Sequence, residues 1–233
     1  MEEKLSQRQI DALLEILDVK NQEYVEPFKF TEKKEPEADL RVSTNQNDWD
    51  YLMKLPISEF KKIVLRRELD KAEQVILVLR HNHDLIMTYL ADRVFTSDKA
   101  LIELAKRRIP SEIEAATKRS ALPDEAMIYL IEHGCQDIRN YLLRRGALSR
   151  AAEMAMVKRG SQHDIMNYIK RFSMYPAGVC ELIKRGKHDE IMMIIKRKNN
   201  LFGYNLKLLI ERGNRKEIEY YLSRYNPQVK IPE

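Results

Sequence analysis

The sequence predicts an all-α protein built as a stack of short helical hairpins. Three observations support this fold class: Gly and Pro are scarce, apolar residues recur at helical spacing, and a pattern of about 26 residues repeats along the chain. Charged residues make up 33% and hydrophobic residues 44% of the 233 positions, against 7 Gly and 8 Pro. This balance is typical of helical proteins, because sandwiches of short strands need many Gly and Pro turns.

Residues 1–19 are predicted to form an N-terminal amphipathic helix. Ser6 and Gln9 have the spacing of a capping box, and apolar residues follow at helical intervals as far as Leu17. One face of this helix is therefore apolar, and we expect it to dock on the rest of the protein through Leu13 and Leu17.

Residues 20–46 are predicted to be a polar linker or a loosely held strap. They mix Glu, Lys, Pro and Asn without apolar periodicity. Such a segment buries too little surface to offset the entropy lost on ordering. We expect the helical body to remain folded when residues 1–46 are deleted.

Residues 47–69 are predicted to form a helical cap in front of the repeats. Asn47 or Asp48 can cap a helix, and Trp49 offers a large apolar anchor. A second helix follows Pro56 and leads into the next segment.

The repeat occupies residues 70–226 and leaves a C-terminal tail at 227–233. Four short apolar-basic segments end in Gly at intervals of 26, 26 and 27 residues. Stepping back by 26 residues reaches Arg108 and then Asn82, which end similar segments, so about six copies are predicted. The four glycines are Gly134, Gly160, Gly186 and Gly213.

Other positions keep the same register. We call the six residues that end these segments the anchors. An Ile stands four or five residues after each anchor, and a Tyr stands three residues after the Ile in four copies, which places both on one helical face. Since these tyrosines share the apolar register, we interpret them as core rather than as stacking platforms for nucleic acid. The residues are Ile86, Ile113, Ile138, Ile165, Ile191 and Ile218, with Tyr89, Tyr141, Tyr168 and Tyr221.

Each copy thus contains a first helix, a turn at the anchor and a second helix. Gly favours the left-handed position that ends a helix, and Asn82 tolerates it better than most residues. We therefore expect a positive φ at all four anchor glycines. Because helices this short are marginal alone, they must stack on their neighbours.

This pattern resembles the α-solenoid proteins, the broad class that includes HEAT, armadillo and ankyrin arrays. The resemblance covers about two thirds of the chain and is one of architecture, since the 26-residue period is shorter than theirs and no Thr-Pro-Leu-His signature occurs. It implies a right-handed α-solenoid, a curved scaffold with a binding surface, and it assigns a function to no individual residue.

An arginine stands eleven residues after every anchor, near the end of the second helix. A cation in the last turn favours the negative end of the helix dipole and can bond free carbonyl groups, which is the structural interpretation of this row. The alternative is that the row binds an acidic or phosphate-bearing ligand. These second-helix arginines are Arg93, Arg119, Arg145, Arg171, Arg197 and Arg224.

A second row of cations stands immediately before the anchors. Since the two helices of a hairpin run antiparallel, this row is expected along the opposite edge from the second-helix arginines. Two parallel basic ridges could follow phosphates without reading bases, whereas a solvated rim is the plainer interpretation. These turn cations are His81, Arg107, His133, Arg159, Arg185 and Arg212.

The sequence carries no strong catalytic signal. It lacks a P-loop, a Gly-rich dinucleotide turn and a nucleophile elbow. Three His-Asp pairs, at His83, His163 and His188, suggest a metal-dependent enzyme, but they stand at different offsets from their anchors and their carboxylates suit helix caps. Neither Cys135 nor Cys180 lies in a CxxC pair, and we expect no metal or other cofactor.

We therefore predict a non-catalytic scaffold that binds a macromolecular partner, with a protein favoured. Nucleic acid is the alternative, because residues 50–233 carry 34 Lys and Arg against 24 Asp and Glu. A metal-dependent enzyme is the least favoured interpretation of the sequence. The start of the chain lacks a signal peptide and no apolar run approaches the roughly 20 residues of a membrane span, so we expect a cytoplasmic protein.

Overall fold

The computed structural model describes residues 3–23, 46–197 and 201–232, and these residues form fifteen α-helices. This confirms the predicted all-α class. The chain divides into two compact units, which we call the central unit, residues 30–146, and the terminal unit, residues 1–29 with 147–233. The even repeat period did not predict this division after Gly146.

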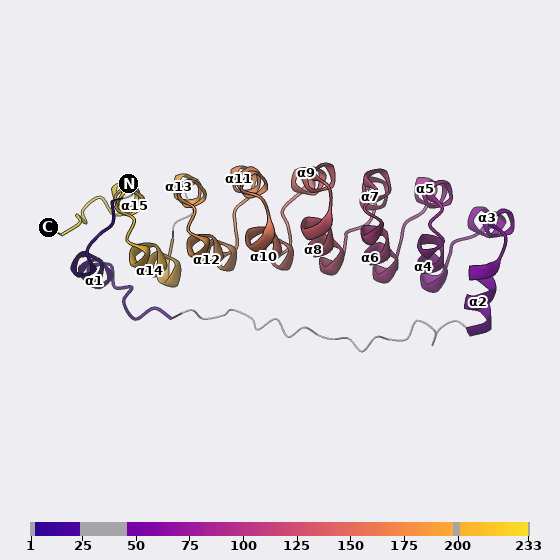
Figure 1. Cartoon of the computed structure of the whole chain (residues 1–233), viewed down its shortest axis with the longest axis horizontal. Helices are drawn as coiled ribbons and strands as arrows, with labels where there is room; N and C mark the ends of the chain where they lie inside the picture. The colour runs from indigo at the N-terminus through magenta and orange to yellow at the C-terminus, as the bar shows by residue number, and fades with distance from the viewer. Residues whose placement is uncertain (1–2, 24–45, 198–200, 233) are drawn as a thin grey trace. The chain divides into compact units, whose positions relative to one another are not determined.

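The central unit contains four helical hairpins in two layers (Figure 1). Within each layer, every helix packs against the helix two places further along the chain. The two helices expected as a cap each join one of these layers at the start of the stack. The first layer holds α2 (Gln46–Lys54), α4 (Lys71–Leu79), α6 (Asp98–Arg107) and α8 (Asp124–His133); the second holds α3 (Ile57–Arg66), α5 (His83–Asp92), α7 (Pro110–Thr117) and α9 (Gln136–Arg145).

The terminal unit repeats this arrangement with three hairpins and one extra helix. Its first layer ends with the N-terminal helix α1 (Gln7–Ile16), which packs on α14 where the next first helix would stand. The other members of the first layer are α10 (Arg150–Arg159), α12 (Pro176–Arg185) and α14 (Gly203–Arg212); the second layer holds α11 (Gln162–Arg171), α13 (His188–Lys196) and α15 (Arg215–Tyr225).

The start of the chain is fastened to the last hairpin by backbone and side-chain bonds. The Leu5 N–H donates to the Gly213 carbonyl at 2.8 Å, and the Gln9 side chain donates to the Pro232 carbonyl at 2.7 Å. Leu13 is fully buried and Leu17 half-buried, as the predicted docking requires. Most of the predicted strap, residues 24–45, lies outside the described residues.

Several helices begin at capping boxes or at prolines, which are recognisable in the sequence. Ser6 and Gln9 form the predicted capping box of α1, and Asp70 with Glu73 forms another at α4. Proline opens α7 and α12, where its missing N–H costs no hydrogen bond.

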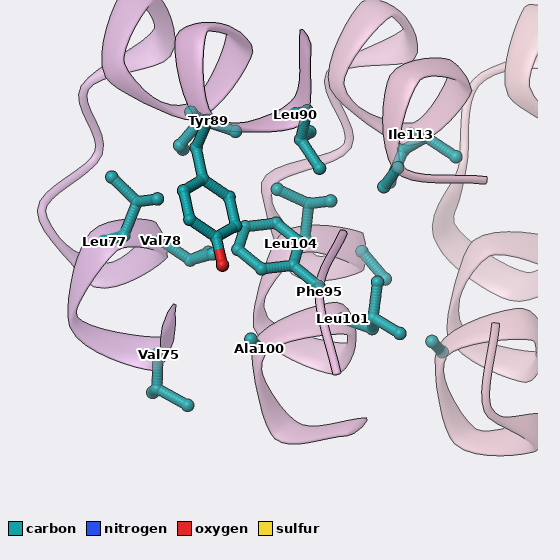
Figure 2. Close-up of a cluster of buried hydrophobic side chains, with 14 of the residues drawn as sticks. Val75, Leu77, Val78, Tyr89, Leu90, Phe95, Ala100, Leu101, Leu104 and Ile113 are labelled. Carbon is teal, nitrogen blue, oxygen red and sulfur yellow. The ribbon is translucent and has the colours of Figure 1, made fainter. Parts of the chain in front are cut away.

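The core runs between the two layers of each unit. In the central unit, Val78 and Leu104 are fully buried near Tyr89, whose ring stacks on Phe95 with 5.4 Å between centroids, and Ile113 is fully buried on the next hairpin (Figure 2). All six register isoleucines are buried, and so are three of the four register tyrosines, with Tyr141 half-buried. The repeat positions therefore mark the buried face correctly.

The expectation of a positive φ is wrong for two of the four anchor glycines. Gly186 and Gly213 are left-handed, with φ of 76° and 70°, whereas Gly134 and Gly160 have φ of −67° and −68°. Asn82 is also not left-handed: it is the N-cap of α5, with φ of −88°.

Steric contact explains glycine at the two extended anchors. A Cβ on Gly134 would lie 2.3 Å from the Leu130 carbonyl oxygen, and one on Gly160 would lie 2.4 Å from that of Met156. Two other hairpins use non-glycine residues in the left-handed region, His81 with φ of 56° and Arg108 with φ of 55°.

Candidate functional site

The turn cation Arg107 is held by a buried carboxylate. Its Nε lies 2.8 Å from Glu112 Oε2, and its Nη2 lies 2.8 Å from Oε1. Glu112, the third residue of α7, is fully buried. The two residues form a bidentate ion pair around the turn that joins α6 to α7, a geometry that only arginine offers.

Related Arg–Glu pairs, each joined through a single arginine nitrogen, recur in the terminal unit. Arg212 Nε lies 3.1 Å from Glu217 Oε2, again five residues on, and Arg185 Nε lies 3.5 Å from Glu190 Oε2. Both carboxylates are fully buried. Each stands directly before a register isoleucine, and this acidic position is the sequence signal that would have revealed the pairs.

A histidine from the preceding hairpin completes two of these pairs. His83 Nδ1 lies 2.9 Å from Glu112 Oε1, and His188 Nδ1 lies 2.8 Å from Glu217 Oε1; both spacings are 29 residues. The histidines of two His-Asp pairs thus bond to buried glutamates of the next hairpin. No group of three or more His, Cys, Asp or Glu in the described part of the chain is arranged to hold a metal ion.

Three second-helix arginines reach back to carbonyl groups at the end of the preceding second helix or just beyond it. Arg93 donates to the Val64 carbonyl, and also to Leu65 at 3.2 Å. Arg145 donates to Ser120 at 3.2 Å, and Arg197 donates to Ile169. These bonds satisfy carbonyl groups that a helix end leaves free and tie successive hairpins together.

The other second-helix arginines are exposed. The Arg224 guanidinium lies 5.9 Å from the centroid of the Tyr225 ring. The side chains of Arg119 and Arg171 make no hydrogen bond or ion pair with another residue in the described ranges 3–23, 46–197 and 201–232. Ligand binding by either row of cations stays a prediction.

A groove lies between the C-terminal halves of α4 and α6 in the central unit. Its volume is about 350 Å³, and apolar side chains of Val78, Leu79 and Ile109 line it. The remaining lining residues are charged or polar: His81, Glu103, Lys106 and Arg107. Sequence reasoning had named His81 and Arg107 as turn cations but had not placed an apolar groove beside them.

The rim of the groove contains one ion pair and one hydrogen bond. Lys106 Nζ lies 2.8 Å from Glu103 Oε1, and both side chains are partly exposed. Arg107 Nη1 lies 2.7 Å from His81 Nδ1. Because a guanidinium only donates, this His81 nitrogen accepts the bond.

Ile102 in α6, Tyr129 in α8 and Leu79 are half-buried and pack against the hydrophobic core of the central unit. No helix formed by the described residues is long and apolar enough to cross a membrane. The chain matches no family model, no curated protein and no solved structure.

Proposed function

We propose that this protein is a non-catalytic scaffold that binds a segment of a partner protein in the groove between α4 and α6. The observation that carries the proposal is the pairing of an apolar floor, formed by half-buried Leu79 and Ile109 over the buried Val78, with a rim of both charge signs. Concave apolar sites with a few polar groups are the usual form of a specific binding site.

The size of the groove suits a side chain of the partner rather than a whole domain. A volume of about 350 Å³ lies at the lower end of the range of about 300 to 1,000 Å³ for small-molecule sites. One bulky apolar side chain, delivered by a helix or an extended segment, would fill it, in the manner of peptides that dock anchor residues into grooves.

Polyanion binding is the second candidate. Exposed Arg119 and Arg171, which bond to no other described residue, favour it. The bonds of Arg93, Arg145 and Arg197 to backbone carbonyls support a structural role for the rest of that row. A protein segment in the groove is therefore the preferred proposal.

A peptide selection tests the groove directly. Peptides chosen from a random phage-displayed library on the full-length protein should carry a bulky apolar anchor. They should lose about tenfold or more in affinity for Leu79→Glu and for Lys106→Glu, because both changes alter the lining. Circular dichroism would establish that each variant is folded.

Lys118→Glu is the matched control. Like Lys106, Lys118 is exposed near the C-terminal end of a helix, but it belongs to the second layer. The two substitutions change the net charge equally and oppose the same helix dipole. Equal binding of the selected peptides by the wild type and both groove variants would contradict the proposal.

A further inference from the structure

Glu153 in α10 is a buried carboxyl group without a cationic partner. Its side chain is fully buried. Oε1 accepts the Tyr175 N–H at 3.0 Å, and Oε2 has no hydrogen-bond partner among the described residues. Glu112, by contrast, is neutralised by Arg107. A buried carboxyl that lacks such compensation favours its neutral form.

Two elements of the terminal unit pack against α10, namely α11 and α12. From α11 the Tyr168 hydroxyl faces the carboxyl, and Tyr175, the N-cap of α12, supplies the backbone donor. Neither tyrosine supplies a positive charge. From α12 the facing residue is Gly178, where a Cβ would lie only 2.2 Å from Glu153 Oε1.

The environment has a clear effect on the acidity of Glu153. Burial raises the pKa of Glu153 to about 7, although the Tyr175 N–H and the Tyr168 hydroxyl act in the opposite direction. The carboxyl therefore changes charge close to neutral pH, where ordinary glutamates remain ionised.

The central unit contains an uncharged counterpart, Gln74. It is the fourth residue of α4, as Glu153 is the fourth residue of α10. Gln74 bonds to Thr96, and Glu153 bonds to Tyr175, each 22 residues further on at the start of the next first helix. The two side chains thus occupy the same helix position in different hairpins, although Gln74 stands eight residues before Asn82 and Glu153 stands seven before Gly160.

Gln74 uses both the acceptor and the donor of its amide. Oε1 accepts the N–H groups of Thr96 and Ser97 at 2.9 and 3.0 Å, and Nε2 donates to the Leu69 carbonyl at 3.0 Å. A protonated carboxyl also has one acceptor and one donor, whereas a carboxylate has no donor. Protonated Glu153 therefore resembles Gln74 in being neutral and in accepting an N–H bond with one oxygen, whereas ionised Glu153 is charged.

We propose that Glu153 is a proton-linked latch: in its protonated form it lies neutral and buried between α10 and the start of α12, and its ionisation leaves a buried charge without a cation, which loosens the packing of this junction. The proton is released to solvent. Because the folded protein holds this proton more tightly than the unfolded chain, the stability contributed by the latch is full at acidic pH. It falls as the pH rises from about 4.5 towards 7 and stays low above that range.

Thermal unfolding of the full chain, followed between about pH 5 and about pH 8, tests the latch. The unfolding midpoint of the wild type should fall as the pH rises. Glu153→Gln should remove part of this fall, because its amide is neutral at every pH. Identical pH dependence in the wild type and Glu153→Gln would overturn the proposal.

Gln74→Glu is the reciprocal variant. It places a carboxyl in the same helix position of the central unit, so its unfolding midpoint should acquire an additional fall with rising pH. A variant whose pH dependence matches that of the wild type would show that this helix position does not favour the protonated form, which contradicts the proposal.

A titration of the wild type keeps the test independent of whether variants fold. The carboxyl carbon of Glu153, followed by NMR, should titrate with a midpoint of about 7, whereas solvated glutamates titrate near about 4.3. The Tyr175 amide should lose protection from hydrogen exchange over the same range. A midpoint near that of solvated glutamates, or unchanged protection at Tyr175, would overturn the latch. Peptide binding to the groove of α4 and α6 is a separate readout in the other unit.

Discussion

Arg107 and Glu112 form a bidentate ion pair in which the carboxylate is completely buried, with both Arg nitrogens 2.8 Å from its oxygens. His83 from the preceding hairpin shares the carboxylate. The pair therefore closes a turn within one hairpin and fastens that hairpin to its neighbour. Its recurrence as Arg212 and Glu217 indicates a connection used in both units.

Removal of the Arg107 guanidinium should destabilise the central unit strongly. Arg107→Gln leaves the buried Glu112 carboxylate without its main cation, and breaking a buried pair in this way costs about 3 to 5 kcal/mol. Urea-induced unfolding followed by circular dichroism would measure the change in free energy.

Lys106→Gln is the control for this measurement. Lys106 precedes Arg107 in α6 and pairs with Glu103, but its side chain is 45% exposed, so loss of the pair should cost less than about 1 kcal/mol. A similar loss of unfolding free energy for Arg107→Gln and Lys106→Gln would mean that burial of the Glu112 carboxylate does not increase the stability contributed by its ion pair.

The triple substitution of Arg145, Arg171 and Arg197 by Gln distinguishes the two interpretations of the second-helix arginines. Arg145 and Arg197 each donate to a carbonyl of the preceding hairpin. Loss of such bonds should cost about 0.5 to 1.5 kcal/mol each, so the melting temperature should fall.

A salt titration of nucleic-acid binding completes that experiment. If the row binds a polyanion, the wild type should bind a single-stranded oligonucleotide at about 50 mM salt, and the triple variant should bind it more weakly with a shallower salt dependence. An unchanged melting temperature together with weakened, salt-sensitive binding would contradict the structural interpretation.

The two kinds of anchor glycine should respond differently to asparagine. Gly213→Asn keeps a residue that tolerates the left-handed region, and its Cβ meets the flexible Cδ1 end of Ile10 at 3.1 Å, so we expect a loss below about 1 kcal/mol. Gly160→Asn drives a Cβ against the Met156 carbonyl oxygen and should cost about 1 to 3 kcal/mol. Chemical denaturation would give both values, and a larger loss at Gly213 would refute the steric explanation.

The docking of α1 can be tested at two leucines of the same helical segment. Leu13 is fully buried, so Leu13→Ala should cost about 2 to 5 kcal/mol in the terminal unit. Leu17 is half-buried, and Leu17→Ala should cost less. Hydrogen exchange in α14 would report the loss locally, and unchanged protection of α14 in Leu13→Ala would show that α1 does not stabilise it.

Deletion of residues 1–46 should leave a helical body whose unfolding remains cooperative, but with α14 less protected. The body keeps its own core, whereas α14 loses the apolar cover of Leu13 and Leu14. Circular dichroism and thermal unfolding of the truncated chain would check this. Loss of cooperative unfolding would show that residues 1–46 are part of the core.

The buried face of each helix was predictable from the sequence. Ile86, Ile113 and their counterparts recur in one register, and side-chain burial within a short helix follows from the local period of apolar residues. Capping boxes are equally local, which is why Ser6 and Gln9 marked the start of α1 correctly.

Tertiary structure alone decided how the turns and charges are used. Gly134 and Gly186 share one sequence position, but the path to the next helix makes the first extended and the second left-handed. Arg107 and Glu112 come together because the chain reverses between α6 and α7, and His83 joins them from another hairpin. The sequence period shows which residues recur, whereas the approach of neighbouring hairpins determines which of them are buried, paired and charged.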